Sequence, residues 1–126
     1  MPFLLDTHVL IWFVEGDNNL PKSVREAIET SNQNFVSMAS FWEMAIKVSL
    51  GNLELTTSFV KYFETVISEG FIILPVDFIH TVKLSELPFH HRDPFDRTLI
   101  AQALSEQLTV ITKEKLFEEY GVTRLW

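Results

Sequence analysis

The chain has 126 residues, of which 47% are hydrophobic and 21% are charged, and its formal net charge is −7. This length and composition predict one folded domain over residues 1–126 and exclude an intrinsically disordered chain. The negative charge argues against a broad cationic surface for nucleic acid, although it does not exclude a nuclease whose acids bind a metal. The absence of cysteine excludes disulfides and thiolate metal sites, and it agrees with the cytoplasmic location that we expect.

No membrane segment is expected either. Spanning a membrane takes about 18 or more apolar residues, and no run in the sequence approaches that length. The apolar N-terminus is interrupted by Asp6 and His8 before the core of a signal peptide would form. We therefore expect no membrane partner.

Short apolar runs alternate with helical patterns along the chain. Apolar, β-branched and aromatic residues predict strands at residues 3–5, 35–37, 71–74, 108–111 and 122–126. Helical spacing and end signals predict helices from about residue 9 to residues 15–17, and over 21–28, 40–50, 58–68, 78–87, 95–106 and 113–120. This alternation predicts an α/β fold, an α/β/α sandwich with a central, mainly parallel sheet covered on both faces.

Four acids occupy positions that such a sheet would bring together. Asp6, Glu43 and Glu114 each come shortly after a predicted strand, and Asp96 lies at the start of the predicted helix 95–106. Ligands of parallel sheets gather beyond the carboxyl ends of the strands, so these acids are expected at one edge. Carboxylate oxygens are the ligands that Mg²⁺ and Mn²⁺ prefer, and a bound ion of this kind activates water against phosphodiesters.

Each acid also has a purely structural interpretation. Asp6 is placed to cap the following helix, and Ser40 with Glu43 fits the capping box. Asp93 is placed as the N-cap of the helix 95–106, where Asp96 would suit the helix dipole. Glu114 fits a solvated acid in the first turn of a short helix. The four acids are therefore either separate residues at helix starts or joint ligands of one metal site.

Four spaced blocks are far more specific than any one acid, namely residues 4–8, 40–47, 90–97 with 99–103, and 110–112 with 120–122. They run nearly from end to end, and together they resemble the PIN-domain ribonucleases of VapC-type toxin–antitoxin modules. This resemblance implies a compact PIN-like α/β/α fold and an endoribonuclease activity that depends on Mg²⁺ or Mn²⁺. It also implies an RNA substrate, a homodimer and a cognate antitoxin protein that inhibits the toxin.

The resemblance also assigns roles to residues by position. Asp6, Glu43 and Asp96 match the acidic site of the family, and Glu114 stands where the family usually has Asp. Asp6 and Asp96 would hold the principal ion, Glu43 would orient or deprotonate the attacking water, and Glu114 would help to place a second ion or the water network. Further contacts around the metal or with phosphate are expected from Thr7, Lys47, Arg92, Asp93 and Arg97.

Two other functions stay open at this point. An aspartyl-phosphate phosphatase also has an acid after its first strand, but it requires a second acid two residues later, where this chain has His8. A catalytically weak or inactive PIN scaffold that acts as a binding module is the other alternative. The extra methylene of Glu114 favours this second alternative, because it alters the position of one acid.

Overall fold

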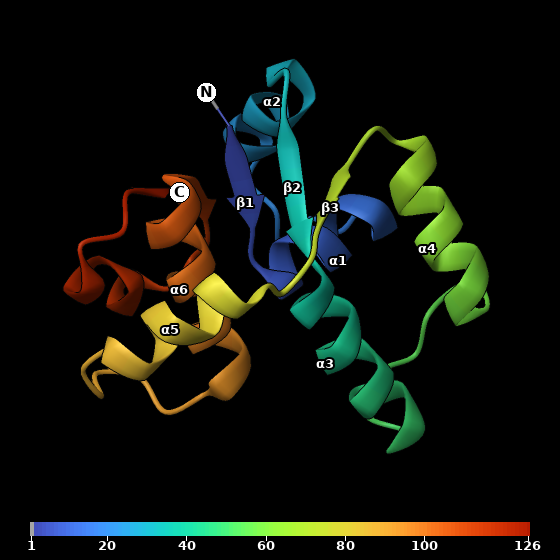
Figure 1. Cartoon of the computed structure of the whole chain (residues 1–126). Helices are drawn as coiled ribbons and strands as arrows, with labels where there is room; N and C mark the ends of the chain where they lie inside the picture. Colours follow the sequence, from blue (N-terminus) through green and yellow to red (C-terminus); the bar gives the residue numbers. More distant parts are fainter. Residues whose placement is uncertain (1) are drawn as a thin grey trace.

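The computed structural model describes residues 2–126 and consists of five strands and seven helices within that range (Figure 1). The strands are β1 (Phe3–Leu5), β2 (Asn34–Ser37), β3 (Ile72–Leu74), β4 (Thr109–Ile111) and β5 (Arg124–Leu125). The α-helices are α1 (Thr7–Glu15), α2 (Lys22–Thr30), α3 (Met38–Ser49), α4 (Phe59–Ser68), α5 (Phe78–Glu86) and α6 (Pro94–Glu106). The last helix, η1 (Lys115–Tyr120), is a 3-10 helix.

The strands form one sheet in the order β3-β2-β1-β4-β5, and every neighbouring pair is parallel. The central strand is β1, in which Leu5 lies opposite Val36 of β2 and Ile111 of β4. The residues that follow these three strands therefore emerge side by side at the carboxyl edge of the sheet. The predicted α/β fold with a parallel sheet is confirmed.

The core consists of two apolar layers, one on each face of the sheet. Alternation along β1 places Phe3 and Leu5 in one layer and Leu4 in the other, as the two-residue period of a strand requires. Helices α1 to α4 pack on the layer that contains Phe3 and Leu5, and α5, α6 and η1 pack on the layer that contains Leu4. The layering of an α/β/α sandwich is confirmed (Figure 1).

The start of α3 differs from the prediction. Ser37, the last residue of β2, is the N-cap, and its side chain accepts a hydrogen bond from the backbone N–H of Ala39. The helix therefore begins earlier than expected, and Ser40 lies inside it. The predicted capping box of Ser40 and Glu43 is wrong, so capping does not explain Glu43.

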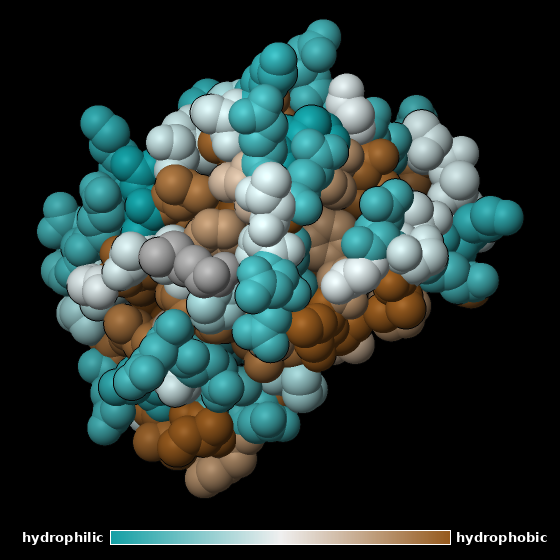
Figure 2. All heavy atoms as spheres, turned by 90° about the horizontal axis from the view of Figure 1, so that it is seen from above, coloured by the Kyte–Doolittle hydropathy of each residue, from teal (hydrophilic) through white to brown (hydrophobic). Residues whose placement is uncertain are grey.

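The face of the molecule near the amino ends of the strands lies opposite the edge where the acids were expected. Figure 2 shows that hydrophilic and hydrophobic side chains are mixed on this face. Within residues 2–126, no helix has both the length and the apolar character needed to cross a membrane.

Candidate metal centre

Asp6 follows β1 directly and is both a helix cap and part of the carboxyl edge. Its Oδ1 accepts hydrogen bonds from the backbone N–H groups of His8, at 2.7 Å, and Val9. Its Oδ2 accepts a hydrogen bond from the hydroxyl of Thr112, the first residue after β4, at 2.7 Å. Burial raises the pKa of Asp6, and the hydrogen bond from Thr112 opposes this shift most strongly.

Glu43 lies in α3 with its carboxylate buried against the site. One oxygen, Oε2, is 2.9 Å from the Nζ of Lys47, one helical turn later. The other oxygen, Oε1, is buried and has no hydrogen-bond partner among residues 2–126. A buried carboxylate oxygen without a donor is costly, so this atom is poised for a ligand that brings positive charge or a hydrogen.

Asp93 and Asp96, both at the start of α6, have different roles. As predicted, Asp93 is the N-cap of α6, and its Oδ1 accepts hydrogen bonds from the backbone N–H groups of Phe95 and Asp96. Because Asp93 completes the cap, the carboxylate of Asp96 is not needed for it.

The carboxylate of Asp96 lies where the negative charges of the site converge. Burial raises its pKa from 3.8 to about 8, and the charges of Asp6, Asp93, Glu114 and Glu43 add to this shift. Acids from β1, α3, α6 and the segment after β4 therefore act on one carboxyl group. The structure brings Asp6, Glu43, Asp96 and Glu114 together as a cluster.

His91 lies between two of these acids. Its Nε2 is 2.7 Å from Oε1 of Glu114 and 3.1 Å from Oδ2 of Asp96, but neither oxygen forms an aligned hydrogen bond with it. Its Nδ1 accepts a hydrogen bond from the backbone N–H of Asp93 at 3.0 Å. A neutral imidazole that accepts at Nδ1 carries its proton on Nε2. With Asp96 and Glu114, His91 forms a group of side chains whose ligand atoms lie within 4.8 Å of one another and could hold a metal ion.

Three other residues expected at the site have different surroundings. The hydroxyl of Thr7 donates a hydrogen bond to Oγ of Ser40 at 2.8 Å, within the buried contact of α1 with α3. The guanidinium of Arg97 is buried and donates to the carbonyl oxygen of Pro88 at 2.8 Å and to the hydroxyl of Tyr120 at 3.2 Å. Arg92 is exposed in the loop before α6. Lys47, which was also predicted to lie at the site, does contact one of its acids, Glu43.

A cavity of about 380 Å³ lies at the carboxyl edge of the sheet, beside two of the four acids. Asp6 and Glu114 line it from the carboxyl edge, and His8 and Trp12 line it from α1. This volume lies within the range of about 300–1,000 Å³ typical of small-ligand sites. The cavity gives water and a ligand access to Asp6 and Glu114.

A model of one protein family matches residues 3–122, which is almost the whole chain, and its description is "PIN domain". The chain belongs to the PIN domain family. PIN domains are nucleases, so the acid cluster lies at the edge of the sheet in a nuclease fold.

Solved structures of the same PIN fold come from several bacteria. A chain in the crystal structure of VapBC2 from Rickettsia felis, bound to a promoter DNA fragment, has a TM-score of 0.75, 14% identity and coverage of 99% of this chain and 98% of that chain. For DNA-bound VapBC from Salmonella typhimurium, the TM-score is 0.74 and the identity is 20%, with coverage of 99% of this chain and 97% of that chain. For a toxin–antitoxin complex from Klebsiella pneumoniae, the TM-score is 0.60 and the identity is 20%, with coverage of 88% of this chain and 85% of that chain. No curated protein matches the sequence.

The residues of this PIN domain fit a hard divalent cation. The cluster offers carboxylate oxygens from four separate elements, and these are the ligands that Mg²⁺ and Mn²⁺ prefer. The unpartnered Oε1 of Glu43 and the raised pKa of Asp96 both indicate that positive charge is lacking at the centre of the cluster. A bound cation would satisfy both groups.

Sequence reasoning missed Thr112 as a partner of Asp6. The hydroxyl of Thr112 accepts a hydrogen bond from the backbone N–H of Glu114 at 3.1 Å. The same hydroxyl also donates to Asp6 across the sheet. Its position as the first polar residue after a central strand was the signal, because the same rule identified Asp6.

Proposed function

We propose that this PIN domain, comprising residues 1–126, is a metal-dependent endoribonuclease and the toxin of a toxin–antitoxin pair. The observation that carries the proposal is the convergence of four acids, because the charges of Asp6, Glu43 and Glu114 all act on the largely buried carboxyl group of Asp96 and raise its pKa. Helix capping requires Asp6 and Asp93, but it requires neither Glu43 nor Asp96. The PIN fold is a nuclease fold, and this convergence gives it a site.

Asp6, Glu43, Asp96 and Glu114 are the residues that would hold Mg²⁺ or Mn²⁺. When bound, such an ion polarises a phosphate and lowers the pKa of a bound water. Thr112 and the first turn of α1 fix the carboxylate of Asp6 through hydrogen bonds to both oxygens. The unpartnered Oε1 of Glu43 is free to orient a water or take its proton, while Lys47 offsets the charge on Oε2.

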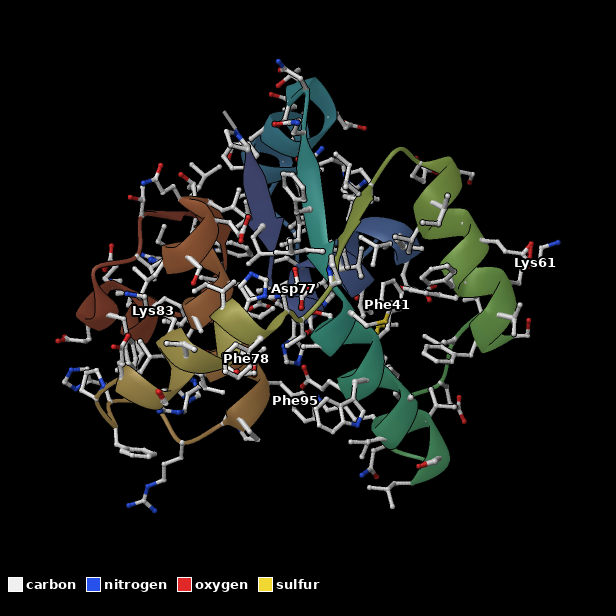
Figure 3. The ribbon with its side chains drawn as sticks, in the orientation of Figure 1. Phe41, Lys61, Asp77, Phe78, Lys83 and Phe95 are labelled. Carbon is white, nitrogen blue, oxygen red and sulfur yellow. The ribbon has the colours of Figure 1, made fainter. Side chains whose placement is uncertain are left out.

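The proposed partners are an RNA substrate, a cognate antitoxin protein and a second copy of the chain, in the cytoplasm. Two observations support the antitoxin and the second copy. The solved structures with this fold include VapBC complexes and a toxin–antitoxin complex, which supports an antitoxin partner. The aromatic ring of Phe78 on α5 is 81% exposed beside the 58% exposed Ile79, and an apolar surface of this kind supports a homodimer (Figure 3).

The test is cleavage of a labelled RNA that contains both stem and single-stranded segments. Wild type and Asp6→Asn, purified in parallel, are incubated with Mn²⁺ and with EDTA. We expect wild type to cleave with Mn²⁺ and not with EDTA, and Asp6→Asn to be slower by about 100-fold or more. Circular dichroism of both proteins controls for folding.

Equal cleavage by the two proteins would indicate a contaminating nuclease and would refute the mechanism. Binding of RNA without cleavage in Mn²⁺ would support the inactive PIN scaffold instead. Hydrolysis of a phosphomonoester but not of RNA would support the phosphatase alternative.

A further inference from the structure

An aromatic groove lies directly beside the acid cluster, where α3 meets the first turn of α6. Its volume is about 500 Å³, and we call it the Trp42 groove after the residue that forms one wall; Phe89 and Phe95 form the others. The rings of Trp42 and Phe95 meet edge to face, with centroids 5.3 Å apart and planes at 88°. In Figure 3 the labelled Phe95 lies between α6 and α3.

The sequence ties this groove to the site. Trp42 immediately precedes Glu43, and Phe95 immediately precedes Asp96. Two walls of the groove therefore come from the same elements, α3 and the first turn of α6, that carry Glu43 and Asp96.

The aromatic rings of the groove are available to a ligand. Trp42 is 64% exposed and Phe89 is 83% exposed, although burying a large aromatic ring is strongly favourable. The contact of Trp42 with Phe95 uses a ring edge, so an indole face is left for another flat group.

The charge of the groove is opposite to that of the protein. Its two charged lining residues are Arg92 and Arg97, and no carboxylate lines it, in a chain whose net charge is −7. Over residues 2–126, neither guanidinium forms an ion pair. Arg97 stacks over the ring of Phe89 at 4.1 Å. The groove therefore combines flat apolar faces with the exposed positive charge of Arg92, a combination that suits a base and its phosphate.

We propose that the Trp42 groove binds one unpaired base of the RNA substrate next to the phosphate that is cleaved. The base stacks on Trp42, and the exposed Arg92 contacts a neighbouring phosphate. Only a base outside a duplex presents its faces for such stacking, so the substrate is single-stranded RNA at this point. Because every base has a π face, the groove selects for strand state and not for base identity. This proposal rests on the ribonuclease function proposed above.

The test separates binding from cleavage. Binding of a fluorescent single-stranded RNA is measured by anisotropy in EDTA for wild type, Trp42→Ala, Trp42→Phe and the control Val60→Ala, which alters an exposed apolar residue on α4. We expect Trp42→Ala to weaken binding by about 5- to 100-fold, the usual range for loss of one stacked base. Trp42→Phe should retain most of the affinity, Val60→Ala should match wild type, and a duplex of the same sequence should bind more weakly than the single strand.

Light scattering and thermal melts on the same samples complete the design. The proposal requires Trp42→Ala to keep the oligomeric state and, since Trp42 is largely exposed, nearly the melting temperature of wild type. Conversion of a wild-type dimer to a monomer by Trp42→Ala would overturn it, because the groove would then be an interface between copies. Equal affinity of wild type and Trp42→Ala would also overturn it.

The failure of this proposal is distinguishable from the failure of the ribonuclease function. If wild type and Trp42→Ala cleave RNA with the same KM and kcat in Mn²⁺, the groove proposal is wrong and the function stands. If RNA binds through Trp42 but is never cleaved, the groove proposal stands as RNA binding and the nuclease function is wrong.

Discussion

Replacing Asp96 with Asn should stabilise the metal-free protein at alkaline pH. In the folded chain Asp96 keeps its proton up to about pH 8, whereas an unfolded carboxyl group releases it near pH 3.8. Between these values the folded state binds the additional proton, so the free energy of unfolding falls as the pH rises. The amide introduced by Asp96→Asn does not titrate in this range, and the variant should lack this dependence.

The magnitude follows from the same two values. Each pH unit between them changes the free energy of unfolding by about 1.4 kcal/mol, so the contribution of Asp96 falls by about 4 kcal/mol from pH 5 to pH 8. Urea denaturation in EDTA at pH 5, 6, 7 and 8 measures this for both proteins. The difference between the two pH profiles isolates Asp96, because the other titrating groups are common to both.

Wild type should therefore lose stability relative to Asp96→Asn across this range, and Mn²⁺ should reverse the loss in wild type alone, because it binds the ionised acids of the folded state. Parallel pH profiles for the two proteins in EDTA would refute the reasoning, since they would mean that Asp96 titrates normally. The acids would then not share one buried centre.

Two further predictions concern residues that support the site. Thr112→Val leaves the buried Oδ2 of Asp6 without its donor, and we expect it to lower the free energy of unfolding by about 1–3 kcal/mol in urea denaturation at pH 7; an unchanged midpoint would show that the contact contributes nothing. Asp93→Ala removes the N-cap of α6 and should cost about 1 kcal/mol, whereas Asp93→Asn should cost only a few tenths because Asn caps equally well. Equal losses in the thermal melts of the two variants would assign the effect to charge instead of capping.

The order of elements was predictable because each has a strong local signal. Leu4 and Leu5 mark a buried strand, Asp6 marks the start of a helix, and Asp93 with Pro94 marks another, and all of these signals agree with the structure. The spatial order of the strands had no such signal. It depends on which runs pack beside β1, and this is a property of the complete core.

The start of α3 was mispredicted because two serines compete for it. Ser37 and Ser40 are both good N-caps, and the glutamate at position 43 made Ser40 look like part of a capping box. The chain turns from β2 into α3 without a loop, so Ser37 serves as both the last residue of the strand and the cap. Local preferences cannot detect that a strand and a helix share one residue.

The acids of the site could be predicted from the sequence, but the residues that contact them could not. Thr112 reaches Asp6 across 106 positions of the chain, and His91 approaches Glu114 from another element. Arg97 looked like a phosphate contact, yet its guanidinium is buried by the loop that it holds. Contacts of this kind depend on tertiary packing, which local patterns do not encode.

Binding of Mn²⁺ tests most directly whether the acids form a cation site or only a set of helix caps. Calorimetric titration with Mn²⁺ compares wild type, Glu43→Gln and the control Glu64→Gln, which alters an exposed acid on α4. The account predicts saturable binding to wild type and to Glu64→Gln, and affinity lower by about 10-fold or more in Glu43→Gln. The absence of binding to wild type, or equal affinity in all three proteins, would contradict it.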